Sequence, residues 1–384
     1  MKVISFGSLN LDITHRVPHI ALPGETLTST HRAVFPGGKG LNQAVALRRA
    51  GMDVYMAGKV GRDGLPLIEY LNAEGIDTSL VRITDGVTGY AMIQVDDAGE
   101  NSILLYPGEN RNLTSQEIDD VLTNVSAGDV VVFQNEINDV PSTIDRAKLR
   151  GATVVLNPSP CDAAISEVKL ENVDYLFVNE LEGAALAKLE GAALAELEGA
   201  ALAKLEGAAS AGARDPKEIL ANLRERYPHL HVILTLGARG AYYCGDSTLE
   251  FAKALPTSVV DSTGAGDTFL GYFMAEILTQ ANPHENSQTG SQMDTQTNAQ
   301  MGSQTGANPA VDARASSPAD AQVGLQASPQ VSLQTSLDRA LQFASAAAAI
   351  AVSRSGAAQS IPTRAEVSRF VGRFDTADLP GHNP

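Results

Sequence analysis

Two carboxylates, Asp261 and Asp267, stand at the ends of a short glycine-rich stretch in the second half of the chain. Gly264 and Gly266 between them let the backbone turn sharply and let a ligand approach closely. The apolar residues that follow recur at helical spacing, so the stretch is predicted to be a tight turn that opens a helix. The first turn of such a helix presents unpaired N–H groups and the positive end of its dipole, which together bind an anion.

A carboxylate inside an anion site is unusual, because its charge competes with the bound anion. Asp267 makes chemical sense there if it takes a proton from a hydroxyl that attacks a phosphate held by the amides of Gly264, Ala265 and Gly266. The alternative is a capped helix start with glycines kept for packing, which explains a lone G-x-G as well. The two flanking carboxylates favour phosphoryl transfer.

Apolar, strand-like runs alternate with helical stretches along most of the chain, which predicts a parallel sheet covered on both faces. Strands are predicted at 2–7, 54–60, 130–134, 153–157, 175–178, 231–236 and 258–260, and helices at 118–125, 143–150 and 337–353. Polar residues just beyond the carboxyl ends of such strands usually line the ligand crevice. Glu136, Asn157, Asn179 and Glu182 stand at these positions.

The stretch Asp261–Asp267 resembles the C-terminal signature of the ribokinase family of carbohydrate kinases (the PfkB family), D-x-x-G-A-G-D. The resemblance runs from Gly7 to about Pro362 and is interrupted by two segments foreign to the family. It implies a ribokinase-like α/β fold, with three α/β/α layers around a central, mostly parallel sheet and a small β-sheet lid. It also implies ATP-dependent phosphorylation of D-ribose at its 5-hydroxyl, giving ribose 5-phosphate, with Mg²⁺ and K⁺ as cofactors.

Asn10 and Asp12 follow the first predicted strand at alternating positions, so their side chains point the same way. An amide beside a carboxylate can hold vicinal sugar hydroxyls, although an Asx turn that closes the strand explains the pair equally well. The family pattern G-S-x-N-x-D favours sugar binding. We assign Glu136, beyond the strand at 130–134, to the same sugar site, together with Asp267.

The segment 36–42 is not a Walker A loop, because Lys39 is followed by glycine and not by Ser or Thr. Its place at the start of a helix suits a backbone that passes close to a small polar ligand. The segment resembles the family's N-terminal signature, which implies that Gly38, Lys39 and Asn42 bind sugar hydroxyls.

Three further motifs resemble family patterns for the cofactors. The N-x-x-E motif implies that Asn179 lies near the nucleotide and that Glu182 organises Mg²⁺, a cation that suits carboxylate and phosphate oxygens. The T-x-G-x-x-G turn implies that Thr235, Gly237 and Gly240 lie along ATP, as does Gly266. The K⁺ ligands implied by position are the Asp261 carboxylate, the carbonyls of Thr263, Ala351, Arg354 and Gly356, and the Ser360 hydroxyl. An ordinary helix C-cap at Gly356 is the alternative interpretation.

Composition limits the partners. The formal net charge of −17 argues against nucleic acid or an anionic membrane. The two cysteines, Cys161 and Cys244, suggest a reducing compartment. The sequence starts directly with a strand-like run, without signal-peptide architecture, and no apolar stretch is long enough to span a membrane. We therefore expect a cytoplasmic protein whose ligands are a small sugar and ATP.

One domain is expected over residues 1–384, with the β-lid formed by about 11–36 and 89–106. The family implies that this lid is shared across a homodimer. An eight-residue repeat fills 190–213 and is predicted to be a helical insert. Residues 282–335 are rich in Gln, Ser, Thr, Asn, Gly and Ala, and this composition predicts a disordered insert.

Two alternatives to a ribose-phosphorylating enzyme stay open at this stage. A kinase of the same family that acts on a nucleoside or another sugar is the nearer one. Tyr90 favours it, since a phenol in the lid strand would shrink the substrate pocket or stack on a base. The other is an inactive sugar-binding regulator, against which the retained Asp267 and glycine loop argue.

Overall fold

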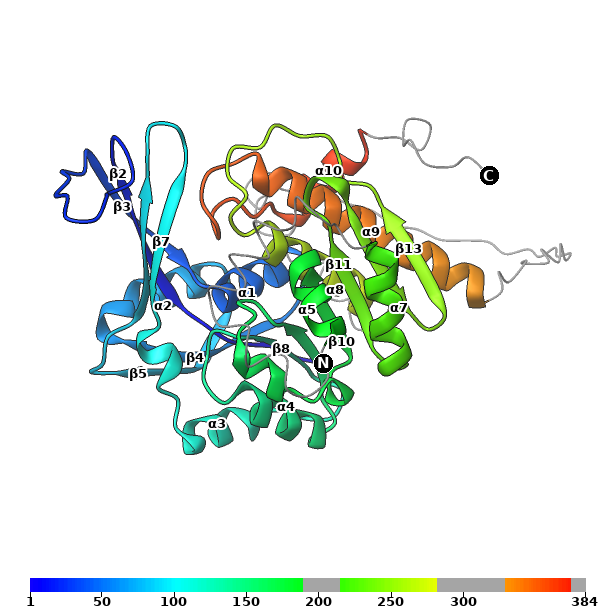
Figure 1. Cartoon of the computed structure of the whole chain (residues 1–384). Coiled ribbons are helices and arrows are strands. Elements are labelled where there is room, and N and C mark those ends of the chain that lie inside the picture. The colour runs from blue at the N-terminus through cyan, green and yellow to red at the C-terminus, as the bar shows by residue number, and fades with distance from the viewer. Residues whose placement is uncertain (189–214, 282–328, 374–384) are drawn as a thin grey trace, which may run out of the picture.

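The computed structural model describes residues 1–188, 215–281 and 329–373 (Figure 1). In these parts of the chain nine strands form one large sheet in the order β13-β12-β11-β10-β9-β8-β1-β4-β5. The pairings are parallel except β11–β12 and β12–β13, which are antiparallel. The strands are β1 (Val3–Phe6), β4 (Val54–Gly61), β5 (Asp77–Thr84), β8 (Val130–Gln134), β9 (Thr153–Asn157), β10 (Tyr175–Asn179), β11 (His231–Thr235), β12 (Ala241–Gly245) and β13 (Thr248–Ala252).

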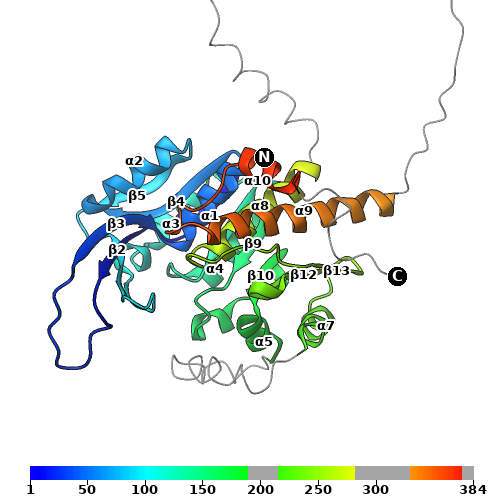
Figure 2. The same ribbon diagram turned by 90° about the horizontal axis from the view of Figure 1, so that it is seen from above.

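Helices cover both faces of this sheet. On β8, Val131 and Phe133 belong to one hydrophobic core, and Val130 and Val132 belong to the other, because successive side chains of a strand alternate. The helices beside Val130 and Val132 are α1 (Lys39–Arg49), α2 (Leu65–Ala73), α8 (Ala265–Ala281), α9 (Pro329–Val352) and α10 (Arg364–Val371). Those on the opposite face are α3 (Ser115–Leu122), α4 (Val140–Leu149), α5 (Glu180–Lys188) and α7 (Pro216–Arg226). Figure 2 shows α9 on one side of β10 and β12 and α5 and α7 on the other, which confirms the predicted three layers.

A second, smaller sheet projects from the body of the molecule (Figure 1). Its order is β3-β2-β6-β7, with β2 and β6 parallel and the outer pairs antiparallel. Its strands are β2 (Asn10–Arg16), β3 (His31–Gly37), β6 (Gly89–Val95) and β7 (Asn101–Tyr106). The predicted small sheet is thus confirmed, and it is built from both predicted segments. None of the helices in the described parts of the chain combines the length and apolar character needed to cross a membrane.

The prediction of a strand at 258–260 is wrong. The segment lies beyond β13 without a sheet neighbour, and Val259 and Val260 are 67% and 64% exposed. Its backbone instead bonds to the end of α9, through a 2.7 Å hydrogen bond from the Val260 N–H to the Val352 carbonyl. β-Branched residues favour strands only where a neighbouring strand offers a surface to pack against.

Several predicted boundaries also move. Helix α3 begins at Ser115, before the predicted 118, because Thr114 and Glu117 form a capping box there. Helix α9 begins at Pro329, so residues 329–335 are helical, although the insert predicted to be disordered included them. The rest of that insert and the repeat at 190–213 lie outside the described residues.

Helices α1 and α8 pack at very short range where Gly271 of α8 meets Ala46 of α1. A methyl group on Gly271 would overlap the Ala46 side chain and would lie 2.8 Å from the Ala46 carbonyl carbon and the Leu47 nitrogen. The next residue, Tyr272, is fully buried and donates a 2.6 Å hydrogen bond from its hydroxyl to the Pro362 carbonyl. Glycine at 271 therefore sets the distance between the two helices.

We expect Gly271→Ala to destabilise the protein. Alanine normally favours a helix over glycine by about 1 kcal/mol, but here the added methyl has no room and should cost a net of about 1–3 kcal/mol. Urea unfolding measures the change. Gly266→Ala in the same helix is the control, since a methyl there meets no heavy atom within 4 Å, and its stability should match or exceed that of the wild type. Equal stability of the two variants would contradict the close packing.

Candidate active site

The two glycine-rich motifs meet at Asp267. This carboxylate lies in the first turn of α8 and is 6% exposed. Two side-chain amides from α1 donate to it, one to each oxygen. Asn42 Nδ2 lies 3.1 Å from Oδ2, and Gln43 Nε2 lies 2.9 Å from Oδ1. The carboxylate is therefore held by amide donors on both sides.

The turn before α8 contains the glycines of the predicted anion site. Gly264 has a φ of +76°, which favours glycine, and the helix starts at the next residue. Gly266 is exposed, and a side chain there would point into open space. The first turn of the helix leaves backbone N–H groups without helical partners. The Ala265 N–H donates to the Ser262 carbonyl at 3.3 Å, so of the three predicted amides those of Gly264 and Gly266 remain candidates for binding an anion.

The predicted sugar-binding residues gather on the same side of this turn. The Lys39 N–H donates to Glu136 Oε2 at 3.1 Å, and the Ser8 hydroxyl donates to the same oxygen. Gly38 has a φ of +92°, and a methyl group there would lie 3.0 Å from the Asn10 nitrogen. The glycine loop can pass this close to Asn10 only without a side chain.

Charge in this pocket is concentrated and shared. Burial raises the pKa of Asp12, and the negative charges of Glu136 and Asp267 raise it further, to about 7. Burial alone would lower the pKa of Lys39, but the carboxylates of Asp267, Glu136 and Glu182 outweigh it, and that pKa lies above its usual value. Lys39 is therefore held as a cation among carboxylates, and Asp12 titrates near neutral pH.

A buried amide fixes the orientation of Asn10. Asn110, in the short 3-10 turn η2 (Gly108–Arg111), accepts the Leu9 N–H at 2.9 Å, so its own NH₂ group points toward Asn10. That group donates to Asn10 Oδ1 at 2.7 Å. Because its carbonyl is engaged, Asn10 presents its NH₂ group to the pocket.

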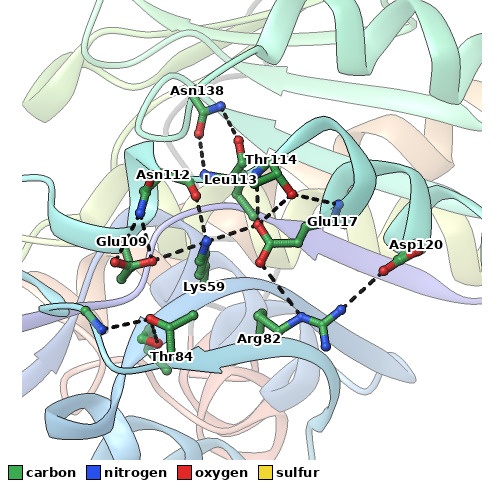
Figure 3. Close-up of polar contacts among 12 residues, drawn as sticks. Lys59, Arg82, Thr84, Glu109, Asn112, Leu113, Thr114, Glu117, Asp120 and Asn138 are labelled. Atoms are coloured by element: carbon green, nitrogen blue, oxygen red, sulfur yellow. Dashed lines mark hydrogen bonds and ion pairs between the residues drawn. The ribbon is translucent and has the colours of Figure 1, made fainter.

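The turn η2 is in turn anchored from below by Lys59 of β4, which is almost fully buried (Figure 3). Its ammonium group lies 2.7 Å from the Asn112 carbonyl, 3.0 Å from Glu117 and 3.3 Å from Glu109. A buried cation that is paired on three sides costs much to disturb. The Lys59 cluster thus connects β4, α3 and the turn η2, whose Asn110 supports Asn10.

The structure gives the N-x-x-E motif a structural role. The Glu182 N–H donates to Asn179 Oδ1 at 2.9 Å, and the Asn179 N–H donates to Glu182 Oε2 at 3.0 Å. This reciprocal pair is a capping box at the start of α5. Asn179 ends β10 in register with Thr235, which ends β11. Both predicted nucleotide residues therefore lie at one edge of the sheet.

The glycines of the predicted nucleotide turn satisfy local backbone needs. Gly237 and Gly240 have φ values of +57° and +123°, and a methyl on Gly240 would overlap the Ala252 carbonyl. In the hydrogen-bond network of the described residues, Thr235, Gly237 and Gly240 are separate from the pocket around Asp267. No hydrogen bond among the described residues therefore connects the predicted nucleotide turn to the residues around Asp267.

Asp261, a predicted K⁺ ligand, contacts the loop after α9. Its two oxygens accept the N–H groups of Thr263 and Gly356, each at 2.9 Å. Burial would raise the pKa of Asp261, but these donors outweigh it, and the pKa lies below its usual value. The alternative of a helix C-cap at Gly356 is wrong, because α9 ends at Val352. The Ser360 hydroxyl is buried and donates to the Ala357 carbonyl at 2.8 Å.

The register of the small sheet removes the argument that Tyr90 narrows the substrate site. Tyr90 pairs with Leu11 of β2, whereas Asp12 pairs with Ala91. Because neighbouring residues of a strand point to opposite faces, Tyr90 lies on the face away from Asp12. There its ring packs against Tyr106, with ring centroids 5.2 Å apart. The phenol therefore does not narrow the pocket beside Asp12.

Four residues that contact the site were not found from sequence: Ser8, Gln43, Asn110 and Gln134. Gln43 follows Asn42 in the glycine motif and Gln134 ends β8, so their positions were visible. Their partners were not, because hydrogen bonds between residues about 90 to 225 positions apart depend on tertiary packing. A helix N-terminus, a buried carboxylate in its first turn and buried polar side chains beside a projecting sheet are the arrangement expected of a kinase of small hydroxylated molecules.

The chain belongs to the pfkB family of carbohydrate kinases, whose family model matches residues 1–310. It is 30% identical to a ribokinase from Haemophilus influenzae over 370 residues, which are 95% of this chain and 96% of the relative. The solved structure of a ribokinase from Cryptococcus neoformans var. grubii serotype A in complex with ADP is 28% identical and has a TM-score of 0.66, over 96% of this chain and 98% of that chain. The predicted family and fold are confirmed.

A further relative is longer. A bifunctional ribokinase/ribose-5-phosphate isomerase A from Fructilactobacillus sanfranciscensis is 33% identical over 286 residues. The match covers 72% of this chain and 48% of that protein. The chain thus spans about half the length of this relative.

The pKa of Asp12 predicts a pH-dependent affinity for the sugar. The charged carboxylate accepts hydrogen bonds at both oxygens, whereas the protonated form loses acceptor capacity. With a pKa of about 7, the protonated fraction rises from roughly a tenth near pH 8 to roughly nine tenths near pH 6. We expect the sugar dissociation constant, measured by calorimetry without nucleotide, to rise up to about tenfold over that range.

Asp12→Asn is the control for this titration. The amide does not titrate, so the variant should bind the sugar more weakly than the wild type near pH 8 and show a flat profile. A wild-type profile as flat as that of the variant would show that Asp12 does not control sugar binding.

Proposed function

We propose that this chain transfers the γ-phosphoryl group of ATP to the 5-hydroxyl of D-ribose, giving ribose 5-phosphate and ADP. The observation that carries the proposal is the Asp267 carboxylate, held by two amides at the N-terminus of α8. It lies beside an amide, a carboxylate and an ammonium group suited to a polyhydroxyl substrate. The names of its relatives, ribokinases in each case described above, support the choice of ribose.

In the proposed mechanism Asp267 takes the proton of the 5-hydroxyl. The sugar oxygen forms a bond to the γ-phosphorus as the bond from that phosphorus to the β–γ bridging oxygen breaks. ADP leaves with the electron pair of the broken bond. The amides of Gly264 and Gly266 donate to the oxygens of the transferring group, whereas the Ala265 N–H is bonded to the Ser262 carbonyl. The Lys39 ammonium offsets charge nearby. Catalysis is then mostly positioning and electrostatics.

The sugar would be held by groups of opposite hydrogen-bonding character. Asn10 offers its NH₂ group to a sugar oxygen, and Asp12 accepts from a hydroxyl. Asn42 Oδ1 is buried and has no hydrogen-bond partner among the described residues. A buried carbonyl without a donor is costly, and a sugar hydroxyl would satisfy it. Gly38 and Glu136 complete this side of the pocket.

The residues present fit Mg²⁺ and K⁺. In the described residues no three His, Cys, Asp or Glu cluster as a metal site, but Mg²⁺ needs only one or two carboxylates besides phosphates and waters. Glu182, whose negative charge raises the pKa of Lys39, would hold Mg²⁺. When bound, Mg²⁺ would neutralise charge on the triphosphate. The Asp261 carboxylate and the oxygens of Thr263, Ala351, Arg354, Gly356 and Ser360 would hold K⁺, because this donor set is all oxygen and its carboxylate stays ionised.

We also propose a homodimer formed through the small sheet and a cytoplasmic location. Strand β7 is an edge strand whose Ile103, Leu104 and Tyr106 are exposed. Exposed apolar side chains on an edge strand favour association with a second chain.

The proposed cytoplasmic location is supported by the cysteines. Cys161 and Cys244 are both free, as suits a reducing compartment.

Asp267→Asn tests the catalytic base. The substitution keeps the shape of the side chain but removes the proton acceptor, so kcat should fall by about 10² or more. The dissociation constant for ribose, from calorimetry, should change little. Turnover above about a tenth of the wild-type value would remove Asp267 from the role of base.

A panel of sugars and nucleosides tests the substrate. A site that hydrogen-bonds a hydroxyl rejects an analogue without it, because the polar groups of the site are left unpaired. We expect kcat/KM for ribose to exceed that for 2-deoxyribose by more than about tenfold. A higher kcat/KM for a hexose or a nucleoside would overturn the choice of ribose and leave the phosphoryl transfer intact.

A further inference from the structure

A second row of amides lies behind Asp267, on the side away from Asn42. Gln134, the last residue of β8, donates from Nε2 to Gln43 Oε1 at 2.7 Å, and Gln43 Nε2 donates to Asp267 Oδ1 at 2.9 Å. Gln43 and Gln134 are both 0% exposed. The three side chains thus form a buried chain of hydrogen bonds from the sheet through α1 to α8.

This chain has only one direction. Gln43 Oε1 already accepts from Gln134, and its second N–H faces Asn157 Oδ1 at 3.5 Å. A flip of the Gln43 amide would set its carbonyl against the Asp267 carboxylate and its NH₂ against the NH₂ of Gln134. Both contacts would be repulsive. This hydrogen-bond pattern therefore favours the orientation in which Gln43 presents an N–H group to Asp267.

Close packing also confines the Gln134 end of this row of hydrogen-bonded side chains. Gln134 lies directly against Gly7, where any side chain would overlap the Gln134 carbonyl. The main chain of Gly40 lies close to the same glycine. The packing therefore fixes Gln134, which fixes Gln43.

We propose that Gln43 is a positioning residue for the catalytic base: it holds Oδ1 of Asp267 and so leaves Oδ2 to take the proton of the substrate hydroxyl. This inference rests on the proposed function, in which Asp267 is the base. Oδ2 accepts one hydrogen bond from Asn42 Nδ2 at 3.1 Å and keeps a second lone pair for the substrate hydroxyl. The Asn42 carbonyl oxygen is buried and has no hydrogen-bond partner among the described residues. The two amides thus have different roles in the proposal. Asn42 is a sugar ligand, whereas Gln43 bonds only to the Asp267 carboxylate and to its supports Gln134 and Asn157.

The test is Gln43→Met, which is similar in length and lacks the donor. Misplacement of a reacting group costs up to about 10²-fold, so kcat should fall by about ten- to a hundredfold. The KM values for ribose and ATP should stay within about threefold, because Gln43 contacts neither ligand in the proposal. The acidic limb of the kcat–pH profile should move to higher pH, since loss of an N–H donor disfavours the charged carboxylate.

Two further variants separate positioning from a general structural role. Gln43→Glu keeps the shape and the acceptor for Gln134 but puts a carboxylate against Asp267, so the same limb should move to higher pH still. Gln134→Met leaves the bond between Gln43 and Asp267 in place and should lose less activity than Gln43→Met. Thermal unfolding and ribose calorimetry establish whether each variant is folded. If Gln43→Met does not fold, the shift of the kcat–pH profile in Gln43→Glu tests the proposal.

A double-mutant cycle decides the outcome. If Gln43 acts through Asp267, then Gln43→Met should lower the residual rate of Asp267→Asn by less than about twofold. A loss as large in that background as in the wild type, or an unmoved pH profile in both Gln43 variants, would overturn the proposal. Failure of the proposed function looks different, since Asp267→Asn alone would then keep most of its activity.

Discussion

The contact between α1 and α8 is the constraint on which the site depends. At Gly271 the two helices approach so closely that a methyl group would not fit against Ala46. One turn earlier on each helix, this closeness lets Asn42 and Gln43 reach both oxygens of Asp267. Interiors are packed too tightly to deform smoothly. A shift of α8 would therefore change the reach of both amides together with the position of the anion-binding turn.

The same packing concentrates negative charge that the ligands must then meet. Burial and the nearby charges of Glu136 and Asp267 raise the pKa of Asp12 to about 7, and Lys39 is a cation beside these carboxylates. Lys39 and the N-terminus of α8 both offer positive potential to an incoming phosphate. In the proposed mechanism, the carboxylates accept sugar hydroxyls, and Lys39 and the N-terminus of α8 accept the phosphoryl group.

The covered parallel sheet was predicted from local sequence patterns, whereas the small sheet was implied by the family resemblance. Alternating apolar strands and helices give two covered faces, and the run on β8 divides its side chains between two cores as expected. What failed depends on neighbours far away in the chain. The β-branched 258–260 has no strand beside it, Tyr90 faces away from Asp12 because of its register with Leu11, and Gln43 contacts Asp267 only in the folded state. Composition likewise did not show that helix α9 begins at Pro329.

The orientation of Asn10 depends on supports outside the proposed sugar site. Lys59 fixes the turn η2, and Asn110 in that turn engages the carbonyl of Asn10. Asn10 then acts as a donor and Asp12 as an acceptor on the same side of strand β2. A sugar hydroxyl can both donate and accept, so a molecule with two adjacent hydroxyls satisfies both groups at once. A ligand with a single hydroxyl there would leave one of them unpaired, and the buried supports prevent Asn10 from turning to compensate.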